Sequence, residues 1–98
     1  MRTETCGRAK AATRLAHARK FLEVAELVAT EDFEESLSVA AALAVLAGIA
    51  ASDAACCRAL GRRSRGSSHR DAAALIAEIE PGGREAVKAF TSLIDLKD

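Results

Sequence analysis

An unbroken run of thirteen apolar residues, Val39 to Ala51, lies in the middle of the chain and restricts the folds that are open to it. A membrane-spanning helix needs about twenty residues and favours Leu, Ile and Phe, whereas this run is shorter and consists mostly of alanine. Alanine is the strongest helix former, and the chain contains neither Trp nor Tyr, so closely packed helices are favoured over a sheet. The run therefore predicts a buried central helix in an all-α protein, with no membrane partner.

The apolar run belongs to the longest of four predicted helices. These helices are expected at about residues 6–30, 35–60, 68–80 and 84–96. Gly61 is a natural end for the second helix, and Pro81-Gly82-Gly83 ends the third. Four helices with short connections in 98 residues predict one domain, residues 1–98, folded as an up-and-down antiparallel four-helix bundle.

Two further features concern the ends of the predicted helices. Ser67 or Ser68 can cap the third helix, with Asp71 in its first turn, where the helix dipole favours a negative charge. The chain stops at Asp98, at the end of the fourth predicted helix, with no glycine, proline or polar tail after it. We therefore expect that helix either to be cut short or to be completed by a partner chain.

The formal net charge of the chain is zero, but the charges are segregated along it. Residues 1–20 contain six basic residues and one acid, residues 58–70 contain five arginines and no acid, and an acidic block lies between them at residues 23–35. In an antiparallel hairpin the start of the first helix lies beside the end of the second, so the two basic blocks should meet at one pole. Such a pole suits a polyanion such as RNA, although two solvated helix ends would give the same charge pattern.

The three cysteines, Cys6, Cys56 and Cys57, show no C-x-x-C spacing and follow no secretory signal. This pattern is typical of free thiols in a reducing compartment, which predicts a cytoplasmic protein. Adjacent residues of a helix point about 100° apart, so Cys56 and Cys57 would not jointly face one metal ion without ligands from elsewhere. We expect no metal and no other cofactor.

Asp53 is a single carboxylate that follows the apolar run. A buried carboxylate must find a donor or a cation, because an unpaired buried charge is strongly destabilising. Two interpretations remain open. Asp53 pairs with an arginine from another helix for structural reasons, or it orients the arginine-rich loop that follows its helix.

The segment Leu46–Ile76 contains an Ala-rich helix that ends in a basic loop, and His69 follows at the start of the next helix. In these features the segment resembles the HEPN family of small helical-bundle domains. Many HEPN domains are metal-independent endoribonucleases, often dimeric, whose site combines an Arg, four to six intervening residues and a His. Arg63 and His69 match this pattern with five intervening residues, and Ser64 supplies the polar residue that often follows the Arg. Arg62 also falls within the permitted spacing.

The resemblance implies a site for transesterification of an RNA phosphodiester. His69 would act as general base or acid, and Arg63 would bind the phosphate through two hydrogen bonds. Asp53 completes the candidate catalytic set if it orients the basic loop. Other arginines in and around the loop are candidate phosphate-binding residues: Arg58, Arg62, Arg65 and Arg70.

The same resemblance also implies a non-catalytic alternative. Many HEPN domains have lost activity and serve as dimerisation or protein-interaction modules, for instance beside nucleotidyltransferases or in systems of the toxin–antitoxin type. In that case His69 would pack or cap at the third helix, and the protein would bind a protein partner. A homodimer is expected under either interpretation. A helix-turn-helix DNA-binding protein is less favoured, because the second helix is too long and the loop too basic for a tight turn.

Overall fold

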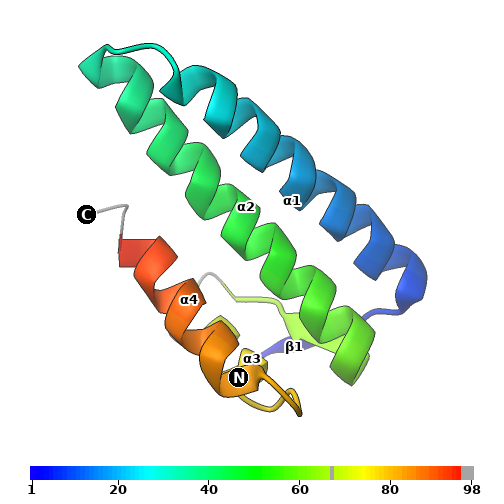
Figure 1. Ribbon diagram of the computed structural model, residues 1–98. Helices are drawn as coiled ribbons and strands as arrows, with labels where there is room; N and C mark the ends of the chain where they lie inside the picture. Colours follow the sequence, from blue (N-terminus) through cyan, green and yellow to red (C-terminus); the bar gives the residue numbers. More distant parts are fainter. Residues whose placement is uncertain (67, 96–98) are drawn as a thin grey trace.

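The computed structural model describes residues 1–66 and 68–95, and its described part is mostly helical (Figure 1). The elements in chain order are β1 (Thr3–Thr5), α1 (Arg8–Ala29), α2 (Glu34–Leu60), β2 (Arg62–Ser64), α3 (His69–Ile76) and α4 (Gly83–Asp95). The four predicted helices are present, which confirms a mainly helical protein. The two short strands were not expected from the sequence. The predicted capping role of Ser67 and the predicted end of the fourth helix at residue 96 fall outside the described residues.

The antiparallel pair formed by α1 and α2 is the largest feature of the molecule (Figure 1). Its interface is made by alanines at seven-residue spacing on both helices. The buried alanines at this spacing are Ala11, Ala18 and Ala25 on α1 and Ala40, Ala47 and Ala54 on α2, and Ala50 of α2 is buried as well. A seven-residue repeat keeps one face of each helix turned toward its partner, and the small side chain lets the two backbones approach closely. Leu15 and Leu22 of α1 are 41% and 49% exposed.

The ends of the helices follow local rules that the sequence makes visible. Gly61 adopts the left-handed conformation, with φ of 73°, and ends α2 as predicted. The Ser68 hydroxyl accepts a hydrogen bond from the backbone N–H of Asp71 at 3.3 Å, which confirms Ser68 as the cap of α3. However, α3 already ends at Ile76, and turns lead from there to α4.

The hydrophobic core lies where α3 and α4 cover the C-terminal half of α2. Its buried members are Cys56, Leu75, Ile76 and Phe90. The absence of a side chain at Gly48 lets Leu93 of α4 lie directly on α2. The helical hairpin extends beyond this core, and α1 packs mainly against α2 among the described elements. This arrangement of two long and two short helices does not establish the expected up-and-down bundle.

A disulfide joins Cys6 to Cys57 and fastens the N-terminal segment to the end of α2. The expectation of three free thiols is therefore wrong for these two cysteines, and only Cys56, which is buried, is free. The expectation failed because β1 pairs with β2 across about sixty residues, in the register Thr3↔Ser64 to Thr5↔Arg62. This long-range pairing brings residue 6 to the end of α2, and cysteine spacing does not reveal such a pairing.

Helix α2 is long and apolar enough to cross a membrane. Core helices of soluble proteins meet the same criteria of length and composition. The apolar run of thirteen residues that we considered in the sequence is only its central part. The C-terminal half of α2 packs against α1, α3 and α4. The absence of a membrane partner stays a prediction.

The burial of core residues predicts how substitutions change the free energy of unfolding. Leu75 is fully buried, so Leu75→Ala should lower the free energy of unfolding by about 2–5 kcal/mol through lost burial and the cavity left behind. Leu27 is 64% exposed, so the matched substitution Leu27→Ala should change it by less than about 0.5 kcal/mol. Urea denaturation followed by circular dichroism measures both values. Equal losses for the two variants would contradict this placement of the core.

Candidate functional site

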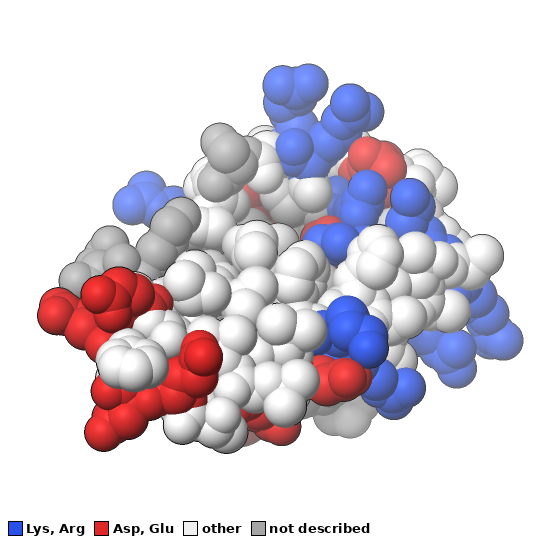
Figure 2. Space-filling model, turned by 90° about the horizontal axis from the view of Figure 1, so that it is seen from above, with Lys and Arg blue, Asp and Glu red and all other residues white. Residues whose placement is uncertain are grey.

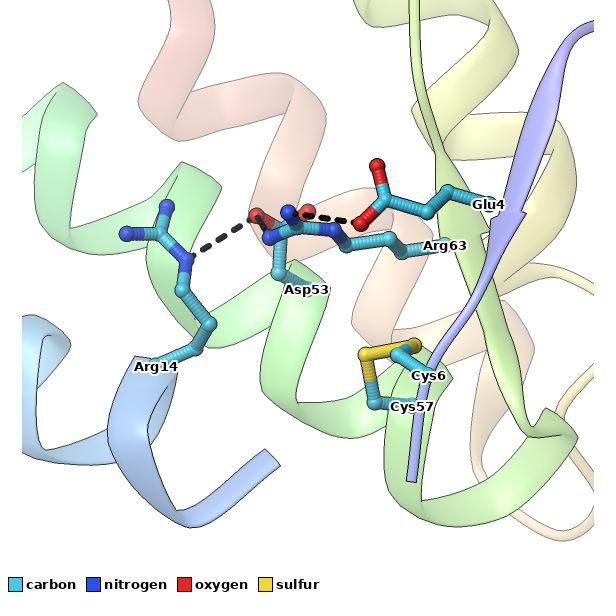
Figure 3. Close-up of a disulfide and its surroundings, with 6 residues drawn as sticks. All are labelled: Glu4, Cys6, Arg14, Asp53, Cys57 and Arg63. Atoms are coloured by element: carbon cyan, nitrogen blue, oxygen red, sulfur yellow. Dashed lines mark hydrogen bonds and ion pairs between the residues drawn. A yellow bond between two sulfur atoms is a disulfide. The ribbon is translucent and has the colours of Figure 1, made fainter. Parts of the chain in front are cut away.

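The carboxylate of Asp53 connects three elements at the basic end of the molecule (Figure 3). Its Oδ2 accepts a hydrogen bond from Nε of Arg14 on α1 at 3.0 Å and another from Nη1 of Arg63 on β2 at 3.1 Å. The three side chains are 18–22% exposed, so water screens these ion pairs less than surface pairs. Asp53 thus pairs with an arginine from another helix, as the structural interpretation expects, and it also contacts Arg63 after the end of its own helix; that it orients the loop stays a prediction.

Arg63 is held on its other side by Glu4 of β1 (Figure 3). Glu4 and Arg63 face each other in the register of the two strands, and Nη2 of Arg63 donates to Oε1 of Glu4 at 3.2 Å. The second carboxylate oxygen of Glu4 lies 3.8 Å from Nε of Arg65. Three arginines and two carboxylates therefore form one continuous network, with one positive charge in excess.

A cavity of about 570 Å³ lies beside this network and brings together residues from β1, α2, β2, α3 and α4. Asp53, Arg63 and His69, the three predicted catalytic residues, all line it. Arg65 lines it as well and is 60% exposed. The Ser64 hydroxyl also belongs to the lining and is buried without a hydrogen-bond partner among the described residues. The cavity thus offers cationic and hydroxyl donors next to an imidazole.

His69 is positioned by packing at the first residue of α3. Its ring lies 6.3 Å from the ring of Phe90 on α4 in an edge-to-face arrangement. Phe90 is buried and also lines the cavity, so the imidazole of His69 packs against an apolar side chain. This placement fixes the ring without a carboxylate or arginine partner among the described residues.

The other predicted phosphate-binding arginines lie outside this cavity. Arg62 donates to Glu78 at 2.6 Å, in a pair that is largely exposed. Arg58 lines a separate groove between α1 and α2, and Arg70 lines another next to α4. Of the four predicted residues, the structure places only Arg65 in the site.

Two residues of the site were not predicted, Arg14 and Glu4. Arg14 stands on the basic side of the first predicted helix, and nothing in its spacing distinguishes it from its basic neighbours. Glu4 is the only acid among the first twenty residues, and that isolation is the one signal that could have drawn attention to it.

The charges of the described residues are separated as expected on the face that Figure 2 shows. The turn between α1 and α2 is acidic, and the opposite end of the hairpin, where β1, β2 and the cavity lie, carries most of the arginines and lysines. The surface seen between the two ends is mostly uncharged. The predicted meeting of two basic blocks at one pole is confirmed.

The free thiol of Cys56, next to the site, has low reactivity. Burial raises the pKa of its thiol above the ordinary value of 9.0, a hydrogen bond with Ser52 lowers it by a smaller amount, and the charge of Asp53 raises it further. Cys56 is therefore a thiol rather than a thiolate at neutral pH. Among the described residues, no group of three or more His, Cys, Asp or Glu side chains could hold a metal ion.

Comparison of the chain with protein-family models, with curated proteins and with solved structures gives no match. The function therefore has to be inferred from the chain's own residues.

The Asp53 network makes a prediction about stability. Asp53→Asn leaves Arg14 and Arg63 without their shared carboxylate and should lower the free energy of unfolding by about 1–3 kcal/mol. Glu78→Gln removes an exposed carboxylate from Arg62 and should lower it by less than about 1 kcal/mol. Chemical denaturation of both variants provides the comparison. An Asp53→Asn variant as stable as Glu78→Gln would mean that the network is only a surface feature.

Proposed function

We propose that the protein is an HEPN-like domain of the cytoplasm that binds RNA at its basic pole and cleaves it without a metal ion at the cavity beside Asp53. The observation that carries this proposal is the meeting of Arg63, Arg65 and His69 around one cavity. Its volume of about 570 Å³ falls within the range of about 300–1,000 Å³ that is usual for small-ligand sites. A phosphodiester with its neighbouring ribose is a ligand of this class.

The residues of the cavity have the chemistry that phosphodiester cleavage requires. His69 carries no competing ionic partner among the described residues, so its imidazole is able to take the 2′-OH proton or to protonate the leaving oxygen. Arg65 is exposed and reaches toward the cavity, where it can contact a phosphate oxygen. The free Ser64 hydroxyl supplies a further donor. Arg63 can join them when a phosphate replaces one of its carboxylate partners, because guanidinium binds either anion through paired N–H groups.

Cleavage and binding assays test this function. In chelator, the protein should cleave a mixed-sequence single-stranded RNA, and His69→Ala should slow cleavage by at least about a hundredfold without weakening RNA binding to the same extent. Arg65→Ala should weaken binding and lower the slope of log affinity against log salt by about one. Arg19→Ala, which removes an exposed arginine of α1 that does not line the cavity, serves as the matched control. An RNA affinity no greater than that of a neutral protein would contradict the proposal.

A second candidate function is assembly, and the exposed apolar surface of the hairpin favours it. A groove of about 430 Å³ between α1 and α2 is lined by alanines and Leu15, with Arg8 and Arg58 among its lining residues. Leu22 continues this stripe on α1, since it lies seven residues after Leu15, and it is 49% exposed. A second copy laid antiparallel along this face would place its acidic turn over Arg8 and Arg58 and would complete a four-helix arrangement.

Self-association tests this candidate. The protein should be a dimer by light scattering at micromolar concentration, and the dimer should weaken at high salt because unlike poles face each other. Leu15→Glu should give a monomer. Leu46→Glu, at a similarly exposed leucine five positions and about 140° around α2 from Ala51, should leave the dimer intact. A monomeric wild-type protein would exclude the homodimer, and a monomeric Leu46→Glu variant would place the interface on another face.

A further inference from the structure

We infer that β1 is a displaceable cover on the phosphate site, in which the Glu4 carboxylate occupies the place of a bound phosphate and the Cys6–Cys57 disulfide determines whether it stays there. This inference rests on the proposed function, because it concerns the regulation of the same cavity. It assigns opposite roles to the oxidised and the reduced protein: the oxidised form is covered and binds RNA weakly, and the reduced form is open.

The carboxylate of Glu4 lies between two arginines of the cavity. One carboxylate oxygen accepts from Arg63 at 3.2 Å (Figure 3), and the other lies 3.8 Å from Nε of Arg65, so a single anion bridges two guanidinium groups. A phosphate presents oxygens to arginine in the same way. Glu4 also lines the cavity itself. A ligand phosphate and Glu4 therefore compete for the same donors.

Strand β1 is held by a few backbone hydrogen bonds and by one covalent bond. The strand has three residues, of which Thr3 and Thr5 are exposed, and it pairs with one other three-residue strand. A two-stranded ribbon of this size is marginally stable in water. The strand is extended by single backbone bonds, from Cys6 N–H to Gly61 and from Arg65 N–H to Arg2. The covalent bond between Cys6 and Cys57, which are buried and 51 residues apart in sequence, is what keeps the strand at a high local concentration over Arg63.

Reduction would release the strand by thiol–disulfide exchange with a dithiol. A thiolate of the reductant attacks the sulfur of Cys6, which is 9% exposed against 3% for Cys57, and expels the Cys57 sulfur as a thiolate that takes up a proton. The second thiol of the reductant then attacks the reductant sulfur that is bonded to Cys6. This forms the disulfide of the reductant and releases Cys6 as a thiol. Two electrons and two protons pass to the protein, and the dithiol becomes a disulfide. In a reducing compartment such disulfides are usually transient or redox-sensing, which fits the proposed cytoplasmic location.

The test compares RNA affinities of matched variants. A fluorescein-labelled single-stranded RNA of mixed sequence is titrated into the protein, with anisotropy as the signal, before and after treatment with dithiothreitol. For the wild type, reduction should tighten binding by about tenfold, the change expected for one recovered charged contact. Glu4→Gln should bind this tightly even when oxidised and should no longer respond to dithiothreitol.

Two control variants separate the cover from general effects. Glu78→Gln makes the same change of charge and frees Arg62 outside the cavity, so it should bind less tightly than Glu4→Gln and keep its response to reduction. Cys56→Ser removes the free cysteine and should respond as the wild type does. Amide exchange at Cys6 and Arg65 should accelerate on reduction while the α1–α2 hairpin stays protected.

Each outcome decides between the two proposals. Measurable RNA binding that is equal in the oxidised, reduced and Glu4→Gln proteins would overturn the cover and leave the RNA-binding function standing. Absence of binding in all forms, Glu4→Gln included, would overturn the RNA-binding function and this inference with it. If reduction unfolds the helices, the oxidised Glu4→Gln variant still gives the decisive comparison, because it keeps the disulfide.

Discussion

The carboxylate of Asp53 is the interaction on which the arrangement of the site depends. It receives hydrogen bonds from Arg14 and Arg63 on one oxygen, and so joins α1, α2 and β2 at a single point. Without it, two partly buried guanidinium groups would face each other with no anion between them. Together with the contact to Glu4, this contact sets the direction of Arg63 at the edge of the cavity.

The network also explains why the basic pole is not simply an open patch of arginines. Arg63 is already satisfied by two carboxylates, and Arg62 by one, so the positive charge that remains available to a polyanion resides mainly in Arg65 and the exposed arginines around it. At the proposed phosphate site, an external anion would therefore bind by exchange with an internal carboxylate rather than by simple addition. Its affinity would be governed by how firmly the internal carboxylates are held.

The helical hairpin serves a different purpose from the site. Its inner face is closed by alanines, which allow close approach but bury little area each, and larger apolar residues such as Leu15, Leu22 and Leu37 remain on its outside. The largest fully buried side chains, Leu75 and Cys56, lie instead in the core with Phe90, where α3 and α4 cover α2. The proposed assembly through the hairpin and the proposed chemistry at the basic pole involve different residues, so mutation can test them separately.

Much of the local structure could be read from the residues. Helix periodicity, the left-handed end at Gly61, the cap at Ser68 and the segregation of charge each depend on neighbours within a few positions, and antiparallel pairing of two adjacent helices then brings the basic blocks together. Asp53 was singled out as a lone carboxylate after the apolar run, and the resemblance to the HEPN family implied Arg63, Arg65 and His69 as site residues; these four residues line one cavity.

The pairing of β1 with β2, the disulfide between Cys6 and Cys57 and the role of Glu4 were not foreseen. Each joins positions more than fifty residues apart, and such contacts arise from the summed packing of the helices between them. Hydrophobic periodicity does not predict the strand pairing, because a three-residue strand is too short to contain a repeat. Cysteine spacing does not predict which cysteines pair. Folding alone placed the carboxylate of Glu4 on the arginine that the sequence had assigned to phosphate.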